Sequence, residues 1–118
     1  MKMSNLATLA LGTIAIAGVA SAHGGTFKPE FQNQQVRVAR VRLEPHQQIP
    51  MHEVPPHVAV WLTDGDLKVS TPDGHSGVQH LRAGQTLWVT MGKHAGENVG
   101  TKAMEFVVVE PLAARPAK

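Results

Sequence analysis

The chain has 118 residues, a formal net charge of +2 at pH 7 and no cysteine. This length predicts one small domain, and the nearly balanced charge gives no electrostatic basis for binding nucleic acid or an anionic membrane. The absence of cysteine excludes a thiol nucleophile, a cysteine-ligated zinc or iron–sulfur centre and a blue-copper centre.

The N-terminus has the pattern of a cleaved export signal. Lys2 provides a positive start, and residues 6–20 form an apolar stretch shorter than the roughly 20 residues that a bilayer-spanning helix needs. Ala20 and Ala22 then provide the small-x-small motif that signal peptidase recognises, which predicts cleavage just before His23. We therefore expect a periplasmic or secreted protein without a stable membrane anchor.

The predicted signal covers residues 1–22, and the chain after it divides into three parts. Residues 23–35 are polar and without periodicity, which predicts an irregular N-terminal arm. Residues 36–111 alternate short runs of β-branched residues with turn signals such as Asp64-Gly65, about every eight to ten residues, which predicts one all-β barrel or sandwich. Residues 112–118 are expected to form a tail on the surface.

Hydrophobic alternation predicts the strands of this domain. In the first strand the apolar face changes between Val38 and Val41, which indicates either a bulge near Ala39 and Arg40 or a strand that crosses from one sheet to the other. Residues 106–109 are apolar on both faces, so the last strand should be central and buried. The predicted strands cover residues 36–43, 57–63, 67–71, 77–81, 85–90 and 104–110.

Two histidines stand where a binding site is expected. His52 lies at the entry to an apolar strand, and His94 follows the strand predicted at 85–90. Side chains at corresponding ends of separate strands can meet at the mouth of a barrel, and neutral imidazoles there suit Zn, Fe, Mn, Ni or Cu. By contrast, His75 and His80 lie in or beside a hairpin loop and are expected to be exposed.

At this spacing the sequence resembles the cupins, a family of small jelly-roll barrels. Their first motif runs Gly, five residues, His-x-His, three or four residues, Glu, six residues, Gly. Residues 46–65 follow this frame with His46 at the first Gly, His52 at the first His and Gly65 at the last Gly. The resemblance covers roughly residues 36–110 and implies a single cupin-type jelly-roll β-barrel.

The second cupin motif is also matched. It runs Gly, five residues, Pro-x-Gly, one or two residues, His, three residues, Asn. The corresponding residues here are Gly84, Thr90 at the Pro position, Gly92, His94 and Asn98.

The resemblance implies a metal site that this sequence keeps only in part. Cupin sites use both histidines of His-x-His, the Glu and the later His, and here His52 and His94 match two of these four. Val54 stands at the second His, and Val58 or Ala59 at the Glu. The candidates for a third ligand are His57, Glu53 and Glu97.

Strand alternation also predicts which side chains face the barrel. It places Val58, Val60 and Leu62 inward and His57 outward, unless the preceding prolines shift the register. Trp61 and Trp88 are then expected on the outer side or at a subunit contact, as in a homodimer. The residues predicted to line the pocket are Val54, Val58, Val60 and Asn98.

Three functions remain open from the sequence. In the first, the barrel binds a small molecule, with or without a divalent metal (Fe, Mn, Ni, Zn or Cu); if the protein is an enzyme, the resemblance to cupins implies metal-dependent oxygenation, isomerisation or lyase chemistry. In the second, the chain is a metal-free, non-catalytic binding module. In the third, the chain binds copper, for which His23 offers its amine and imidazole, and Met51 and Met91 offer thioethers beside the motif histidines.

Overall fold

The computed structural model describes residues 25–112, so the predicted signal and the last six residues of the tail lie outside the described part. Its strands are β1 (Thr26–Gln32), β2 (Val36–Leu43), β3 (Gln48–Val54), β4 (His57–Trp61), β5 (Gly65–Ser70), β6 (Ser76–Leu81), β7 (Thr86–Val89), β8 (Gly92–Asn98) and β9 (Met104–Pro111). Within this part, a helix with the length and apolar character needed to cross a membrane is not found.

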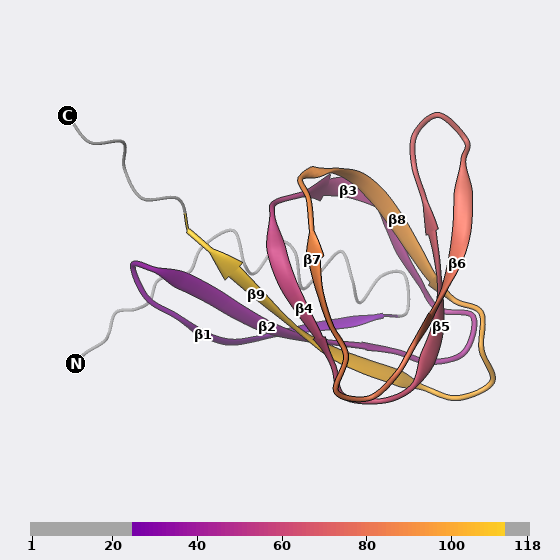
Figure 1. The fold of residues 1–118 in the computed structure, drawn as a ribbon, viewed down its shortest axis with the longest axis horizontal. Coiled ribbons are helices and arrows are strands. Elements are labelled where there is room, and N and C mark those ends of the chain that lie inside the picture. Colours follow the sequence, from indigo (N-terminus) through magenta and orange to yellow (C-terminus); the bar gives the residue numbers. More distant parts are fainter. Residues whose placement is uncertain (1–24, 113–118) are drawn as a thin grey trace.

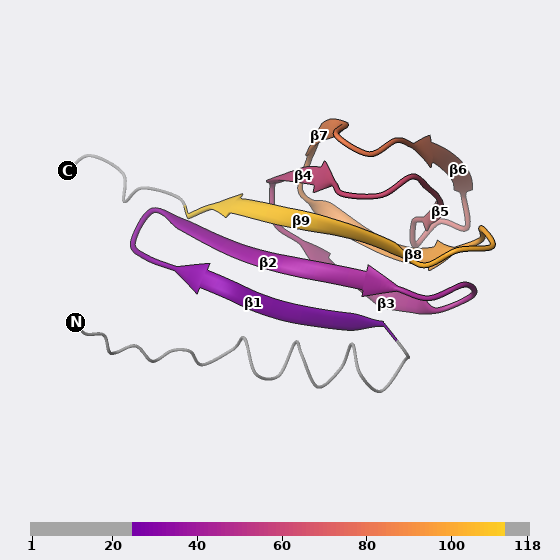
Figure 2. The same ribbon diagram turned by 90° about the horizontal axis from the view of Figure 1, so that it is seen from below.

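The strands form two antiparallel sheets that pack against each other (Figure 1). The five-stranded sheet has the order β1-β2-β9-β4-β7, and the four-stranded sheet has the order β3-β8-β5-β6. Figure 2 shows β1, β2, β9 and β4 side by side, with β9 in the middle of its sheet. The predictions of an all-β fold and of a central last strand are therefore confirmed.

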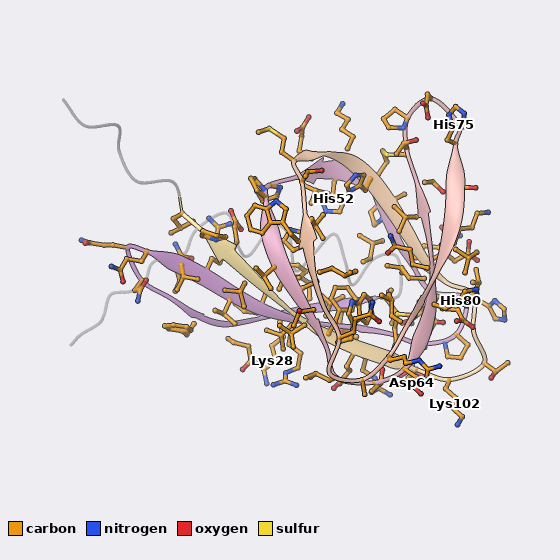
Figure 3. All side chains as sticks on the ribbon, viewed as in Figure 1. Lys28, His52, Asp64, His75, His80 and Lys102 are labelled. Atoms are coloured by element: carbon orange, nitrogen blue, oxygen red, sulfur yellow. The ribbon has the colours of Figure 1, made fainter. Side chains whose placement is uncertain are left out.

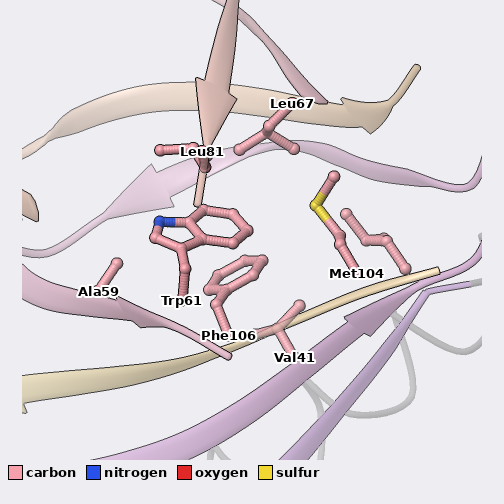
Figure 4. Close-up of a cluster of buried hydrophobic side chains, with 8 residues drawn as sticks. Val41, Ala59, Trp61, Leu67, Leu81, Met104 and Phe106 are labelled. Atoms are coloured by element: carbon pink, nitrogen blue, oxygen red, sulfur yellow. The ribbon is translucent and has the colours of Figure 1, made fainter. Parts of the chain in front are cut away.

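The core lies between the two sheets and is built around Trp61 of β4 and Phe106 of β9 (Figure 4). Their ring centroids are 4.1 Å apart at an interplanar angle of 38°, a tilted arrangement that adds to the gain from burying two large apolar side chains. Trp61 is only 2% exposed, so its predicted place on the outer side is wrong. The other buried members of this cluster are Val41, Leu43, Ala59, Leu67, Leu81 and Met104.

The predicted irregular arm contains a strand. β1 pairs antiparallel with β2, and the register shift in this pair lies between Pro29 and Phe31. β2 pairs with β9 without a shift from Val36 to Leu43, so the bulge predicted near Ala39 is absent from this pair. The apolar residues of β2 change face for another reason, because both faces of the sheet carry apolar side chains there.

The facing of β4 is the reverse of the prediction. His57, Ala59 and Trp61 are buried on the inner face, whereas Val58 and Val60 are only partly buried and lie on the outer face. Direct pairing with Val109 of β9 and Trp88 of β7 places Val58 on that outer face as well. The predicted inward positions of Val58 and Val60 are therefore wrong, and Leu62 is 40% exposed rather than inward.

A tight turn connects β2 to β3 at the first position of the cupin-like motif. The amide of Gln47 donates a hydrogen bond to the carbonyl oxygen of Glu44 at 3.0 Å. His46 has φ of 70°, and together with Pro45 before it this corresponds to a type II turn, whose third residue favours glycine. His46 thus adopts the conformation that the motif's glycine would adopt most easily.

Candidate functional site

His52 and His94 lie directly opposite each other on the paired strands β3 and β8. Residues directly opposite on antiparallel strands have Cβ atoms about 5 Å apart and project from the same face. On β8 that face also carries Gly96 and Asn98, which pack towards the core. The two histidines from the two motifs therefore meet on the inner face of the four-stranded sheet, as their spacing predicted.

A β-bulge in β3 sets which side chain faces His94. The pairing shifts between Ile49, which is opposite Gly96, and His52, which is opposite His94. Three residues on β3 thus correspond to two on β8, and the extra residue restores the inward direction of His52. Val54 follows on the same face opposite Gly92 and is 8% exposed, in agreement with its predicted inward position.

His52 and His57 make the same local hydrogen bond. Nδ1 of His52 lies 2.8 Å from the carbonyl oxygen of Pro50, and Nδ1 of His57 lies 2.9 Å from the carbonyl oxygen of Pro55. A carbonyl oxygen can only accept, so Nδ1 carries the proton in both rings. In the neutral form of either ring, Nε2 is therefore the unprotonated nitrogen, the atom that can accept a hydrogen bond or bind a metal.

His57 is the third imidazole of this end of the barrel. It is 8% exposed at the start of β4, and burial lowers its pKa below the ordinary value of 6.5. The nearby imidazoles of His94 and His52 lower the pKa further, whereas the Pro55 carbonyl and the Glu110 carboxylate raise it. The balance keeps His57 neutral at pH 7, with a lone pair available on Nε2.

Glu110 and Arg37 complete the polar groups beside His57. They lie opposite each other on β9 and β2 and form an ion pair with an N–O distance of 3.6 Å. Within the described residues, Nε of Arg37 is buried without a hydrogen-bond partner. Neither side chain was predicted from the sequence. The signal was available, because Glu110 continues the inward alternation of Phe106 and Val108.

The remaining predicted third ligands do not face this group. Glu53 is exposed and follows His52, so it projects from the other face of β3. Glu97 lies within β8 rather than in a loop and is opposite Gln48 and Lys68, again on the other face. Of the three candidates, the structure brings only His57 towards His52 and His94.

Asn98 lies on the inner face but is not open to a ligand. It is 0% exposed, and its side-chain amide bonds the backbone of Leu43, Lys102 and Gly100. Its predicted place in the pocket is therefore corrected to a place in the packed interior between the sheets.

The imidazole nitrogens of His52, His57 and His94 have the chemistry of metal ligands, but their arrangement in this structure does not suit a resident metal. Imidazole Nε2 atoms backed by a carbonyl at Nδ1 are typical metal ligands. In residues 25–112, however, no three His, Asp or Glu side chains lie close enough together to hold a metal ion. Met51 and Met91 are 42% and 69% exposed, and His23 lies outside the described residues.

A separate hollow lies at the opposite end of the barrel, where Figure 3 labels Asp64, His80 and Lys102 away from His52. Its volume is about 330 Å³, and its lining also includes Asp66 and Arg82. Nδ1 of His80 lies 2.7 Å from Oδ1 of Asp66. The His80 side chain is 79% exposed and that of His75 is 85% exposed, which confirms the prediction that both are exposed.

No protein-family model matches the chain, and no curated protein matches it. The chain does match solved structures. A cupin domain of Bordetella pertussis Tohama I is 27% identical with a TM-score of 0.72, and the match covers 76% of this chain and 95% of that one. An uncharacterised conserved protein with a double-stranded β-helix domain from Klebsiella pneumoniae is 22% identical with a TM-score of 0.61, over 78% and 86% of the two chains.

A third structure extends the comparison to an archaeal protein. An RmlC-like cupin family protein with a double-stranded β-helix fold from Methanocaldococcus jannaschii is 16% identical with a TM-score of 0.60, and the match covers 75% of this chain and 81% of that one. Three observations indicate the same fold. They are the two antiparallel sheets, the pairing of the two motif histidines at one end, and the similarity to these solved structures. The chain has the cupin-superfamily, RmlC-like double-stranded β-helix fold.

Proposed function

We propose that this chain is an exported cupin that binds a small molecule at the end of the barrel formed by His52, His57 and His94. The observation that carries the proposal is the position of His57, which is 8% exposed and on the inner face near the other two imidazoles. A buried neutral imidazole with Nε2 unprotonated is a hydrogen-bond acceptor for a ligand's hydroxyl or amide group. Export is proposed from residues 1–22 alone.

Arg37 and Glu110 extend the chemistry that this end can recognise. The Arg37 side chain is 32% exposed, so its guanidinium offers N–H donors that a ligand oxygen can accept from. The site thus offers acceptors from the imidazoles and a cationic donor from Arg37. This combination fits a small polar molecule that has both a hydroxyl or amide and a carbonyl or carboxylate oxygen.

Divalent-metal binding is the second candidate function. The Nδ1 hydrogen bonds of His52 and His57 favour it, because they direct Nε2 of each ring to be the ligating atom. The separation of the donors in the structure opposes it. Binding Zn, Fe, Mn, Ni or Cu would thus require side-chain rotation, and bound metal would supply Lewis-acid chemistry.

One experiment separates these candidates. Native mass spectrometry of the exported protein, purified without chelator or histidine tag, shows any bound small molecule or metal as extra mass. We expect an organic adduct in the parent that His57→Ala and His94→Ala lose. The matched control is His75→Ala, which removes an exposed histidine and should retain the adduct.

The same spectra would also reveal two outcomes that contradict small-molecule binding. An adduct with the mass of a metal ion, lost in the same two variants, would select the second candidate. A parent that carries no adduct, even after incubation with the divalent metals and with an extract of the producing cells, would exclude both.

A further inference from the structure

The hollow at the end of the barrel opposite His52 is walled by three segments of the chain (Figure 3). The first leads into β5, the second ends β6, and the third is the connection between β8 and β9. The volume of the hollow, about 330 Å³, is at the lower end of the range of ligand pockets, about 300–1,000 Å³. The hollow therefore suits a small ligand.

Two carboxylates line the hollow, and each uses one oxygen in a bond within the chain. Oδ1 of Asp66 accepts a hydrogen bond of 2.7 Å from Nδ1 of His80, its direct partner across β5 and β6. Oδ1 of Asp64 accepts a hydrogen bond of 2.8 Å from the backbone amide of Ala83. Since a carboxylate has two oxygens, Oδ2 of each aspartate can accept hydrogen bonds from a ligand.

Gly100 leaves room beside the Asp66 carboxylate. The φ angle of Gly100 lies outside the left-handed region, so its backbone does not require glycine. A Cβ atom at this position would lie 3.7 Å from Oδ2 of Asp66 and 3.4 Å from Oδ1 of Asn98, which is van der Waals contact. The missing side chain therefore leaves Oδ2 of Asp66 accessible from the hollow.

Two cationic side chains, those of Arg82 and Lys102, also line the hollow. Both residues are exposed. Among residues 25–112, neither forms a salt bridge within the chain, whereas Arg37, Arg40 and Arg42 all do. The guanidinium of Arg82 and the ammonium of Lys102 thus keep their donors for a ligand, and a carboxylate matches the fork of a guanidinium.

Hydrogen bonds fix the backbone that carries these cations. The amide of Arg82 donates to Oε1 of Gln85 at 3.0 Å, and the amide of Gln85 donates to the carbonyl oxygen of Arg82 at 2.9 Å. The carbonyl oxygen of Lys102 accepts a hydrogen bond of 2.9 Å from the side-chain amide of the buried Asn98. A backbone that is ordered before binding lowers the entropy cost of holding a ligand.

We propose that this hollow binds a small zwitterion, namely a free amino acid. The ligand's carboxylate accepts hydrogen bonds from Arg82 and Lys102, and its ammonium group donates to the Oδ2 atoms of Asp64 and Asp66. A ligand with one sign of charge satisfies only one of these two pairs and is repelled by the other. The site lies at the opposite end of the barrel from His52, so it does not depend on the ligand proposed there.

A titration followed by nuclear magnetic resonance tests the proposal. The exported protein, labelled with ¹⁵N, is titrated at low ionic strength with each proteinogenic amino acid in turn. At least one should produce saturable shifts of the amide signals of Gly65, Gly100 and Thr101, while those of His52 and His94 stay unchanged. Acetate and ethylammonium, which each carry one of the two charges, should bind at least about tenfold more weakly.

Two variants and their matched controls locate the contacts. Lys102→Gln and Asp66→Asn should each weaken binding at least about tenfold, because each removes a charged partner of the ligand. Lys28→Gln also removes an exposed lysine, but on β1, and should bind as the parent does. Asp73→Asn removes another aspartate that pairs with a histidine, His75 at 2.9 Å, and should likewise leave binding unchanged.

Three results would overturn the proposal. The first is the absence of saturable shifts in the hollow with every amino acid. The second is binding of acetate or ethylammonium as tight as that of the amino acid, because the hollow would then recognise only one sign of charge. The third is unchanged affinity in both Lys102→Gln and Asp66→Asn, each with the spectrum of a folded protein, because the ligand would then bind elsewhere.

Discussion

The side-chain amide of Asn98 donates a hydrogen bond of 2.9 Å to the carbonyl oxygen of Leu43, and this bond links the two sheets. The same amide donates to the carbonyl oxygen of Lys102 at 2.9 Å, and Oδ1 of Asn98 accepts from the amide of Gly100 at 2.9 Å. The asparagine of the second motif therefore holds the β8–β9 connection and both sheets together from a fully buried position.

We expect Asn98→Ala to lower the free energy of unfolding by about 3 kcal/mol, because it leaves buried backbone groups without partners. Urea denaturation followed by fluorescence measures this loss. Asn33→Ala is the control, since Asn33 also caps two backbone amides, of Gln35 and Val36, but at an exposed turn. Its loss should stay below about 1 kcal/mol. Equal losses in the two variants would contradict the structural role of Asn98.

His46→Gly should stabilise the protein. His46 has φ of 70°, a conformation that costs a non-glycine residue about 1–2 kcal/mol, while glycine adds an unfolded-state entropy cost of somewhat under 1 kcal/mol. The net gain should be about 0.5–1 kcal/mol. Gln48→Gly, two residues later in β3, should instead destabilise, as glycine does within a strand. Both changes can be read from urea denaturation midpoints, and a loss in His46→Gly would show that its side chain compensates for the strain.

The stability of the protein should fall as the pH is lowered below 6.5. The pKa of His57 is below 6.5 in the folded chain, chiefly through burial. Between that folded pKa and 6.5, the unfolded chain binds more protons at this residue than the folded chain does, so acid favours unfolding there. Well above pH 6.5, where the unfolded imidazole is neutral too, the residue contributes no pH dependence.

Thermal unfolding of His57→Gln between pH 7 and pH 5 measures this contribution. The variant should lose less stability across this interval than the parent does. His75→Gln, at an 85% exposed side chain, should follow the parent. A His57→Gln profile parallel to that of the parent would mean that the imidazole takes up a proton in the folded protein as easily as in the unfolded one.

Export of the chain should remove its first 22 residues. Intact-mass measurement of the protein from the periplasm or medium is expected to give a chain that begins at His23. Ala22→Arg places a large charged side chain in the small-x-small motif and should abolish cleavage, whereas Ser21→Gln, at the variable middle position, should leave it unchanged. Uncleaved parent protein in the exported fraction would contradict the signal prediction.

The fold and the meeting of His52 and His94 could be predicted from the sequence. Both predictions use the number of residues between turns and between motif positions, which the sequence states directly. The sequence did not predict β1, β3 and β8 as strands. β8 has the sequence GKHAGEN and β3 contains a bulge, so neither shows the alternation of β-branched residues that marks a strand. These two strands form because they pair with each other. The sequence of either segment alone therefore does not predict its strand.

The facing of β4 could not be predicted, because both of its faces are apolar. Val58 and Val60 alternate with Ala59 and Trp61, and hydrophobicity alone does not tell which pair is buried. The same property explains the false bulge in β2, where Val36 and Val38 lie on the outer face and Val41 and Leu43 on the inner one. Both errors have one physical cause, because the five-stranded sheet carries apolar side chains on its outer face as well as on its inner face.

The bulge in β3 makes the chemistry of the site depend on chain length as well as on residue type. With the pairing of Ile49 and Gly96 kept and no extra residue in β3, Met51 would stand opposite His94 in place of His52. Deletion of one residue between Ile49 and Met51 would leave His52 in place, but loss of the bulge itself would exchange a nitrogen atom for a sulfur atom at the mouth of the barrel. The donor that a ligand meets in this protein is thus selected by one backbone irregularity, so that a one-residue shift of strand register in β3 can alter ligand preference without any substitution.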